Sequence, residues 1–395
     1  MFEHFPGRTW AEIDVDALIH NIRKLREITN PAAKIMAVVK ADAYGHGADF
    51  CARVLCENGA DMLGVSTMEE AHQLRSAGIT APILILGYID KRHCSYVVSE
   101  DITTTVFSSE FANALSRESE KQKKPAKIHI KLDTGMGRIG FTSADSYVEE
   151  IKTICSLPGL VPEGIFTHFS SADEDCEYTR TQFSQFLDML SCLEKEGITF
   201  PIRHACNSAG SLGFPEMHLD MVRAGIILYG LPAGTEKVQR EWKDRFSPVM
   251  TLKTSLVQVK EHEKGESIGY GRTYFTKRKS LIGTIPVGYA DGYSRRLSNR
   301  TSVLIHGEKA PVVGNICMDQ SMIDLTDFKK KPKTSEEAVL FGKQKTKTGQ
   351  VFLPAEEVAE LMGTIHYELT CLVGKRITRI YLENEKVVHM FNAIW

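Results

Sequence analysis

Short apolar runs alternate with amphipathic helical patterns through the first 230 residues, and this alternation limits the possible folds more than any other feature. Eight runs resemble buried strands: IMAVV, MLGVS, PILIL, TTTVF, KIHIKL, GIFTHF, IRHAC and GIILY. Helical patterns such as TMEEAHQLRSAG and TRTQFSQFLDMLSCLEKEG lie between most of them. Apolar strands that alternate with helices imply a helix-covered parallel sheet. Eight such units in about 220 residues favour a closed (β/α)8 barrel of the TIM type, with a doubly wound open sheet as the alternative.

The pattern changes after LPAGTEKVQREWKD. Segments with a period of two, such as SLVQVKEH and SVLIHG, are broken there by Gly and Pro turns, and one short helical pattern stands at AEEVAELMG. We therefore expect an α/β chain of two domains, a barrel over residues 10–240 and a β-rich domain over residues 241–395. Residues 1–9 are expected to pack on the second domain. The first helix is expected in DVDALIHNIRKLREIT, with Asp14 as its cap.

Composition excludes several kinds of partner. The 48 Lys and Arg against 50 Asp and Glu give a formal charge of −2, which provides no electrostatic footprint for nucleic acid or an anionic membrane. A small-molecule substrate fits better. The sequence has no run of about 18 apolar residues and no basic segment followed by an apolar run at its start, so we expect a cytoplasmic protein. None of the nine cysteines stands at CxxC spacing, which fits reduced thiols, and no metal site is expected.

Lys40 ends the first apolar run, in AVVKADAYGHG. Active sites of barrels assemble at the C-terminal ends of the strands. Desolvation there lowers the pKa of an amine and makes it nucleophilic, as Schiff-base chemistry requires. Taken alone, Lys40 would be interpreted as a surface lysine at a strand end rather than as a catalytic one. Tyr44, Gly45, His46 and Gly47 strengthen the catalytic interpretation, because they follow in a loop that could approach a ligand closely.

Five blocks over essentially the whole chain resemble the alanine racemase family, which consists of fold-type III enzymes of pyridoxal 5'-phosphate (PLP). The blocks are AVVKADAYGHGA, KLDTGMGRIGF, THFSSADE, MVRAGIILYG, and the pair GYGRTY and NICMDQSMIDL. Their family order and similar intervals make the resemblance specific. It implies an alanine racemase activity with PLP as cofactor, and a homodimer whose active sites are shared between subunits. It also implies that the product D-alanine supplies peptidoglycan synthesis.

By this resemblance, Lys40 forms the Schiff base with PLP, and Tyr270 in SIGYGRTY is the second catalytic base, supplied by the partner subunit. Racemisation needs both groups, because the proton leaves Cα on one face and returns on the other. Two bases on opposite faces satisfy this geometry. Without its motif, Tyr270 would be interpreted as an aromatic residue of a strand.

The resemblance places Arg223, in VRAGIILYG, opposite the pyridine nitrogen of PLP, with His168 fixing the arginine. Many PLP enzymes use a carboxylate there, which keeps the ring protonated as an electron sink. An arginine cannot accept that proton, so the ring is expected to stay unprotonated and transamination to be suppressed. As a lone histidine at a strand end, His168 would be interpreted as a packed polar residue.

The phosphate of PLP is expected to bind hydroxyls and backbone N–H groups after the last strands of the barrel, a ligand set that suits a dianion. The resemblance assigns five residues to it: Tyr44, Ser208, Gly225, Ile226 and Tyr367. Asn207 and His204 are expected directly behind these groups. Ser208 alone would be an ordinary turn residue, and only the whole set indicates a phosphate site.

Arg138, in KLDTGMGRIGF, resembles the arginine that contacts the phenolic oxygen of PLP and the substrate carboxylate, for which a planar permanent cation is suited. Lys131 matches a lysine that is often carbamylated to hold that arginine, and an ion-paired strand lysine is the alternative. Met318, in NICMDQSMIDL, is expected to bind the substrate carboxylate through its N–H, with Asp319 positioning the site. Cys317 is expected only to line it, because no acyl-transfer apparatus accompanies it.

Tyr289 in VGYADGY and Asp173 in SSADE resemble residues of the corridor that admits substrate between the subunits. Asn315 departs from the family pattern, because many relatives have an arginine there, so the charge of the corridor is altered. Serine-preferring relatives differ around the tyrosine matched by Tyr367, which is retained here. Alanine is therefore the expected substrate, with a broader-specificity or serine racemase as the alternative.

Two further functions are compatible with a PLP barrel. A basic amino-acid decarboxylase of the same fold type would place an acidic residue opposite the pyridine nitrogen, so Arg223 argues against it. A PLP carrier without enzymatic activity would need neither a second base nor a substrate clamp. Tyr270 and Met318 in the β-rich second domain argue against the carrier.

Overall fold

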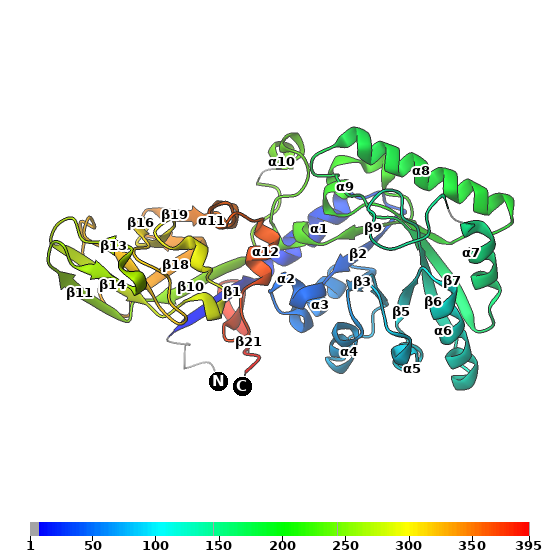
Figure 1. The fold of residues 1–395 in the computed structure, drawn as a ribbon, viewed down its shortest axis with the longest axis horizontal. Coiled ribbons are helices and arrows are strands. Elements are labelled where there is room, and N and C mark those ends of the chain that lie inside the picture. The colour runs from blue at the N-terminus through cyan, green and yellow to red at the C-terminus, as the bar shows by residue number, and fades with distance from the viewer. Residues whose placement is uncertain (1–7, 145, 243, 395) are drawn as a thin grey trace. The chain divides into compact units, whose positions relative to one another are not determined.

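The computed structural model describes residues 8–144, 146–242 and 244–394 (Figure 1). The chain divides into two compact units. The barrel unit consists of Ala17–Ala43 and Ala48–Ser247. The C-terminal unit consists of the described residues up to Asp16, the short segment Tyr44–Gly47, and the chain from Pro248 onward. Both units are therefore built from segments that are distant in the sequence.

Eight parallel strands form the sheet of the barrel unit, in the order β8-β7-β6-β5-β4-β3-β2-β9. Their bounds are β2 Lys34–Val38, β3 Met62–Val65, β4 Ile83–Ile85, β5 Thr103–Val106, β6 Ala126–Lys131, β7 Leu160–Phe166, β8 Ile202–His204 and β9 Met221–Ala224. Two backbone hydrogen bonds join the segments that contain β8 and β9: Asp220 N–H, just before β9, to Arg203 O at 3.1 Å, and Arg223 N–H to Cys206 O, just after β8, at 3.0 Å. The predicted (β/α)8 barrel is confirmed.

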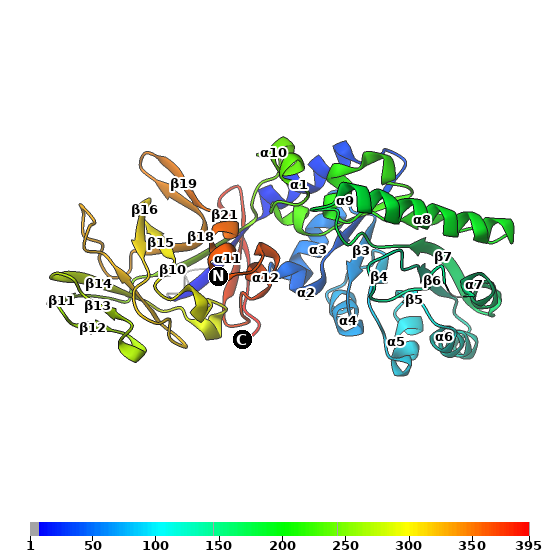
Figure 2. The same ribbon diagram turned by 45° about the horizontal axis from the view of Figure 1, so that its top comes forward.

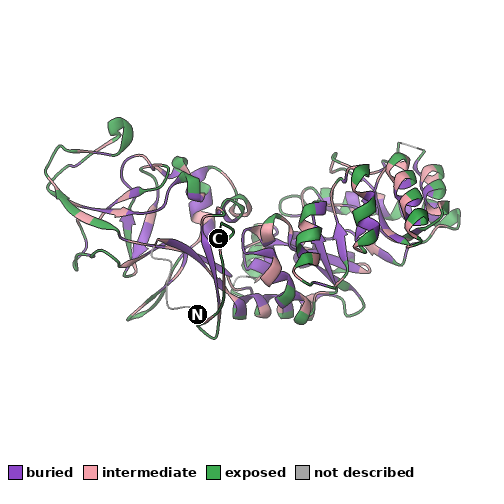
Figure 3. Cartoon of the chain, turned by 90° about the horizontal axis from the view of Figure 1, so that it is seen from below, coloured by how far each residue is buried: buried purple, intermediate pink, exposed green. Residues whose placement is uncertain are grey.

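Helices cover the outside of this sheet (Figures 1 and 2). They are α1 Val15–Ile28, α3 Ala48–Glu57, α4 Met68–Ser76, α5 Cys94–Ser99, α6 Ser109–Gln122, α7 Tyr147–Ser156, α8 Cys176–Lys195 and α9 Ser208–Gly213, while α10 Glu236–Trp242 follows the last barrel strand and has no buried residue. Helix α8 buries one face, including Phe186, Met189 and Leu193, and Asp175 caps it by accepting from Tyr178 N–H. The buried residues concentrate on the strands and the inward faces of the helices (Figure 3). No helix in the described part of the chain is both long and apolar enough to cross a membrane.

The eighth strand differs from the prediction. The run GIILY was expected as a strand, but Ile226–Tyr229 forms a 3-10 helix, η3, and the preceding Met221–Ala224 forms β9. Gly225, with φ −115° and ψ −100°, turns the chain after the strand, and Gly230 ends the helix at φ +70°. All four residues of η3 are buried, and complete burial makes a short helix and a strand look alike in sequence.

The large sheet of the C-terminal unit has the order β16-β15-β18-β10-β1-β20-β21, with β19 paired to β18. Its strands are β1 Thr9–Asp14, β10 Met250–Ser255, β15 Ser302–Ile305, β16 Glu308–Pro311, β18 Glu337–Thr346, β19 Gly349–Leu353, β20 Thr378–Glu383 and β21 Lys386–Phe391. Smaller sheets join β11 Gln258–His262, β14 Ser280–Ile285 and β17 Ser321–Asp324, and pair β12 Ser267–Ile268 with β13 Tyr274–Phe275. Helices α11 Ala355–Met362 and α12 His366–Cys371 complete this β-rich unit.

Strand β1 lies inside this large sheet, antiparallel to β10 and parallel to β20. The sequence placed residues 10–16 in the barrel, whereas the chain crosses from the C-terminal unit to the barrel unit after Asp16. The difference arises because β1 has the same apolar pattern as a barrel strand and leads directly into α1. Of the nine N-terminal residues expected on the second domain, residues 1–7 lie outside the described residues. Arg8 and Thr9 both donate to Pro286 O, at 2.9 Å each.

Candidate active site

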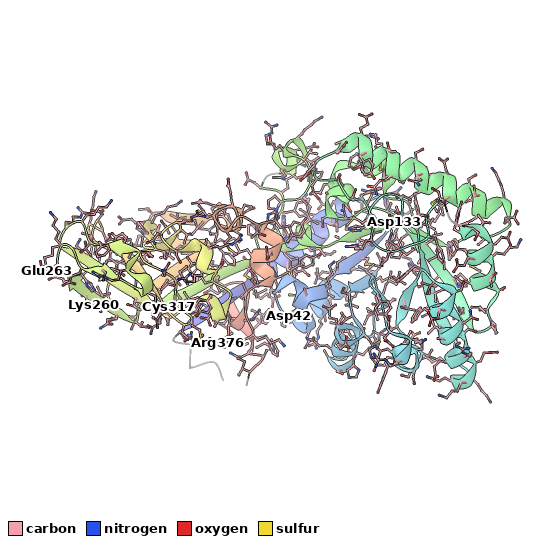
Figure 4. The ribbon with its side chains drawn as sticks, in the orientation of Figure 1. Asp42, Asp133, Lys260, Glu263, Cys317 and Arg376 are labelled. Atoms are coloured by element: carbon pink, nitrogen blue, oxygen red, sulfur yellow. The ribbon has the colours of Figure 1, made fainter. Side chains whose placement is uncertain are left out.

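Lys40 is followed by a turn of left-handed backbone. The angle φ lies between +52° and +55° at Ala41, Asp42, Ala43 and Tyr44. A left-handed conformation costs residues other than glycine about 1–2 kcal/mol each. Strain of this kind persists only where the surroundings fix the backbone, and it clusters at functional sites. Asp42 helps to fix the backbone of this turn, because its carboxylate accepts a hydrogen bond at 2.7 Å from the N–H of Ala48 at the start of α3 (Figure 4).

The segment that continues this turn packs inside the C-terminal unit. Arg379 Nε donates to Gly45 O at 3.1 Å, and the hydroxyl of Tyr381 donates to His46 O at 3.1 Å. Gly45 has φ +84°, and a Cβ there would lie 2.2 Å from Thr370 O, so only glycine fits. The sequence predicted that this loop approaches a ligand closely, whereas its close neighbour in the structure is the backbone of α12.

Tyr44 and Tyr367, the two tyrosines predicted for the phosphate, lie together in the C-terminal unit with ring centroids 6.3 Å apart. Burial, and then the neighbouring Cys371, raise the pKa of the Tyr44 phenol. Tyr44 therefore stays protonated at physiological pH. A neutral phenol can donate a hydrogen bond to an anion.

Arg223 lies on β9 with its side chain buried at the C-terminal end of the barrel strands. Its Nη atoms donate to four acceptors: Thr167 O at 2.9 Å, Ala205 O at 2.8 Å, His168 Nδ1 at 3.0 Å and His204 Nδ1 at 2.9 Å. The Nε–H makes no hydrogen bond to the described residues. Burial lowers the pKa of Arg223 to about 10, so the side chain remains a cation at pH 7.

The two histidines that accept from Arg223 are neutral, because burial and then the charge of Arg223 hold the pKa of each well below its usual range. The network extends further than the sequence indicated. His204 Nε2 lies 2.8 Å from His129 Nδ1, and His129 Nε2 lies 3.3 Å from Glu163 Oε2. Since arginine can only donate, His168 and His204 accept at Nδ1 and carry their protons at Nε2, so His204 donates to His129, and His129 in turn donates to Glu163. The hydrogen bonds of this network therefore all point in one direction, from Arg223 to the carboxylate of Glu163.

We expect the neutral state of His204 to make the protein less stable in acid. The pKa of His204 is lower in the folded chain than in the unfolded chain, so below about pH 6.5 only the unfolded chain takes up the proton. Stability should then fall by up to about 1.4 kcal/mol at this residue for each pH unit below 6.5. Melting curves between pH 5 and 7 check this: wild type should lose more Tm on acidification than His204→Asn. An identical pH dependence in both proteins would contradict the assignment.

Lys131 ends β6 and is buried, and Phe166 lies 5.5 Å from its Nζ and 5.4 Å from the guanidinium of Arg223. Its Nζ donates to Leu132 O. Burial lowers the pKa of Lys131 to about 7, and the charges of Arg223 and Arg138 add to the effect while Asp133 opposes it. Above pH 7 this side chain is thus a neutral amine.

Arg138 lies in the loop after β6, which Asp133 organises (Figure 4). One oxygen of Asp133 accepts from the N–H groups of Gly135, Met136 and Gly137, and the other accepts from Arg138 N–H at 2.8 Å. Burial favours the neutral acid, but these N–H groups outweigh it and lower the pKa of Asp133. The Arg138 side chain is exposed, and it makes no hydrogen bond or ion pair to the described residues.

Ser208 and Gly225 lie together where β8 and β9 end. Gly225 N–H donates to Ser208 Oγ at 2.9 Å, and Ser208 is buried at the start of α9. Asn207 caps this helix by accepting from Gly210 N–H at 2.9 Å. Ile226 opens η3, and its N–H makes no hydrogen bond to the described residues. The residues of the barrel unit that are predicted to bind the phosphate therefore lie together.

Tyr270 belongs to the C-terminal unit and is 74% exposed there. It stands in a turn between Gly269 at φ +75° and Gly271 at φ +72°. Asn315 donates from Nδ2 to Tyr270 O at 2.7 Å. In this chain Asn315 therefore supports the loop of the predicted second base.

Met318 is 53% exposed, and its N–H makes no hydrogen bond to the described residues. Its carbonyl accepts from Ala290 N–H, and the carbonyl of Cys317 accepts from Tyr289 N–H, both at 3.1 Å (Figure 4). A Cβ on Gly288 would lie 2.2 Å from Cys317 O, so the two segments require glycine there. Tyr289, predicted for the corridor, is thereby hydrogen-bonded to the segment that is predicted to bind the substrate carboxylate.

The other residue predicted for the corridor, Asp173, lies in the barrel unit, where its carboxylate accepts from Gly234 N–H at 2.6 Å. Asp319 pairs with Arg376 at 2.8 Å in the C-terminal unit. Arg376 also reaches the buried Asp291 at 3.5 Å, and Arg8 pairs with Asp291 at 3.1 Å. Sequence reasoning missed Arg376, Asp291 and Arg8, because nothing in their local pattern distinguishes them from surface charges.

Four basic side chains surround one neutral histidine in the barrel unit: after burial, positive charge on Arg223, Arg138, Lys131 or Lys40 lowers the pKa of His168. Among the described residues, no group of three or more His, Cys, Asp or Glu side chains is placed to hold a metal ion. A (β/α)8 barrel with cations gathered at the strand C-termini, followed by a β-rich domain, places the chain among the two-domain barrel enzymes.

Comparison with known proteins defines the family. The family described as alanine racemase, N-terminal domain, matches residues 13–233, and alanine racemase, C-terminal domain, matches residues 249–381. This chain belongs to the alanine racemase family. The alanine racemase of Methanococcus maripaludis is 48% identical over 94% of this chain and 98% of its own. That of Clostridium novyi is 44% identical over the full length of both.

Solved structures agree with this assignment. The alanine racemase of Clostridium difficile 630 has a TM-score of 0.92 and 38% identity, covering 99% of this chain and 100% of its own. The alanine racemase of Bartonella henselae, described with covalently bound pyridoxal phosphate, has a TM-score of 0.83 and 29% identity, covering 95% of this chain and 100% of its own.

Proposed function

We propose that this protein interconverts L-alanine and D-alanine with PLP held on Lys40, and that it supplies D-alanine for peptidoglycan from the cytoplasm. The observation that carries the proposal is Arg223, buried and held by two neutral histidines with its Nε–H unused by the described residues. A permanent cation at this position distinguishes a racemase from PLP enzymes that need a protonated ring. The free thiols of all nine cysteines fit a reducing compartment.

The residues present fit PLP. Lys40 offers an amine at a strand end, and the Nε–H of Arg223 offers a donor for a pyridine nitrogen that carries no proton. Ser208, Ile226 N–H and the neutral phenol of Tyr44 are donors suited to a phosphate dianion. PLP, when bound, withdraws electrons from the substrate and so makes the proton on its Cα acidic.

The chain's own groups then move that proton. Lys40 serves one face of Cα and Tyr270 of a second copy of the chain serves the other, so a proton taken by one base is replaced by the other and the configuration inverts. Arg223 can donate but not accept, so it leaves the pyridine nitrogen unprotonated and limits side reactions. The neutral His168 and His204 hold its guanidinium in one orientation.

Binding of the substrate carboxylate is assigned to Arg138 and to the N–H of Met318. Both residues are exposed in the single chain, as is Tyr270. An exposed base and an exposed N–H donor favour a homodimer in which a second copy covers them and excludes water. Light scattering of the purified protein tests the dimer directly.

Lys131 is proposed to be carbamylated. Its neutral amine attacks carbon dioxide, an N–C bond forms, and one proton is released. The product is an anion beside Arg138 and Arg223, where a buried ammonium would be repelled. We expect a carbamate signal in 13C spectra with labelled bicarbonate, decreasing below pH 7 as the amine takes up a proton.

Lys131→Met should remove this signal and lower kcat/KM about tenfold, the effect of losing one hydrogen bond to a charged group. Lys127→Met is the matched control, since Lys127 lies on the same strand and pairs with Asp101 at 3.3 Å. A carbamate that survives in Lys131→Met would refute the assignment.

A racemisation assay of the recombinant protein over the common L-amino acids tests the proposed function. We expect alanine to be the best substrate, together with the absorbance of PLP bound to lysine. Carbon dioxide release from lysine, ornithine or arginine would indicate a decarboxylase instead. PLP binding with no turnover of any amino acid would indicate a carrier.

A further inference from the structure

One carboxylate, that of Glu70, binds two backbone N–H groups at the ends of neighbouring barrel strands. Glu70 Oε1 accepts from Ala41 N–H at 2.7 Å, and Oε2 accepts from Ser66 N–H at 2.6 Å. Ala41 N–H belongs to the peptide that directly follows Lys40, and Ser66 directly follows β3. Both bonds are shorter than the usual N–H···O distance of about 2.9 Å.

Glu70 is diverted from the role that its local sequence indicates. Thr67 caps α4 by accepting from Glu70 N–H at 3.3 Å, and a Thr followed three residues later by Glu is the pattern of a capping box. In a capping box the glutamate side chain returns to the N–H of the capping residue. Here its two oxygens bond instead to Ser66 and to Ala41.

The turn after Lys40 needs this support. The parallel ladder between β2 and β3 ends at Val38 and Gly64, and Val39 N–H still bonds to Gly64 O at 2.8 Å. Beyond it the backbone is left-handed, so Ala41 N–H has left the ladder. Without Glu70 this N–H would lose its acceptor at the first residue of a strained turn, and the strain would favour relaxation.

We propose that Glu70 is a positioning residue for Lys40. It fixes the peptide plane between Lys40 and Ala41, and so fixes the direction in which the Lys40 side chain leaves the strand. The role rests on the proposed function in one respect, namely that Lys40 is the residue that binds PLP. Glu70 itself touches neither cofactor nor substrate in this assignment.

Glu70→Gln tests the role with little change in size. An amide has one oxygen and one NH2 group, so the NH2 would face a backbone N–H and only one of the two bonds can be kept. Glu69→Gln is the matched control, because Glu69 is exposed, lies in the same first turn of α4 and loses the same charge. Any effect of charge on the helix is then common to both variants.

The first measurement is the rate at which the PLP-free protein takes up PLP, followed by absorbance and confirmed by borohydride trapping on Lys40. We expect Glu70→Gln to be at least tenfold slower than wild type and Glu69→Gln to stay within twofold. Equal rates in the two variants would overturn the role of Glu70. Failure of the wild type to load PLP on Lys40 would overturn the proposed function instead.

Hydrogen exchange of the Ala41 amide gives a second readout that needs neither PLP nor activity. The amide should be protected in wild type and in Glu69→Gln. It should exchange at least tenfold faster in Glu70→Asp, whose shorter side chain cannot span both N–H groups. Equal exchange in wild type and Glu70→Asp, or no protection in wild type, would overturn the proposal.

Discussion

Replacing Lys40 by alanine should abolish racemisation, with a fall in kcat/KM of at least about 10⁴-fold, because the variant loses both the anchor for PLP and one of the two bases. The absorbance of lysine-bound PLP should disappear as well. The left-handed turn after residue 40 should persist, since Asp42 and Glu70 hold it through backbone N–H groups. Absorbance spectra and a coupled D-alanine assay measure both effects.

Lys34→Ala is the control for this experiment. Lys34 opens the same strand β2, is exposed, and lies at the opposite end from Lys40. It should keep the wild-type spectrum and rate. A Lys40→Ala protein that still carried PLP on a lysine would show that another amine is the anchor.

Tyr270→Phe should retain PLP and its spectrum but lose about 10²- to 10⁴-fold in kcat/KM, the usual contribution of a general acid or base. The two enantiomers have equal free energies, so the loss must be the same in both directions. The kinetic isotope effect of deuterium at Cα need not be the same in both directions. It should increase mainly in the direction in which Tyr270 removes the proton, because the chemical step then limits the rate.

The loop should tolerate this change, because Asn315 binds the backbone carbonyl of residue 270 and not its hydroxyl. Tyr274→Phe is the matched control: it removes a hydroxyl that bonds to Asp324 at 3.4 Å in the same unit, and it should leave the rate unchanged. Isotope effects that are the same in both directions, with an unchanged rate, would show that Tyr270 is not a base.

Seven of the eight barrel strands could be predicted from their apolar runs, because burial on both faces makes such runs continuous. The eighth could not be located from the run GIILY, because complete burial hides the difference between strand and 3-10 helix. Residues 10–16 were placed with the barrel because the sequence carries no signal for the partners of strand β1. Its pairing with β10 and β20 spans most of the chain.

In the candidate site, too, the sequence predicted residues that lie in motifs and missed those that are recognised only by their partners in space. Arg223, His168 and Ser208 lie in motifs, so a resemblance could find them, and the structure brings Arg223 and His168 together. His129 and Glu163 extend the network through positions with no motif. Glu70 could only be interpreted as half of a capping box, because its real partner, Ala41, is 29 residues away.

Strand β1 also affects how the protein is made. The hydroxyl of Thr9 meets that of Thr254, 245 residues later in the sequence, in the middle of the large sheet. At about 5–20 residues per second, a ribosome needs roughly 12–50 s to deliver this partner. Until then the first strand has an unpaired backbone edge on each side. A nascent chain therefore completes its barrel helices while its opening segment is still exposed to chaperones, proteases and other chains.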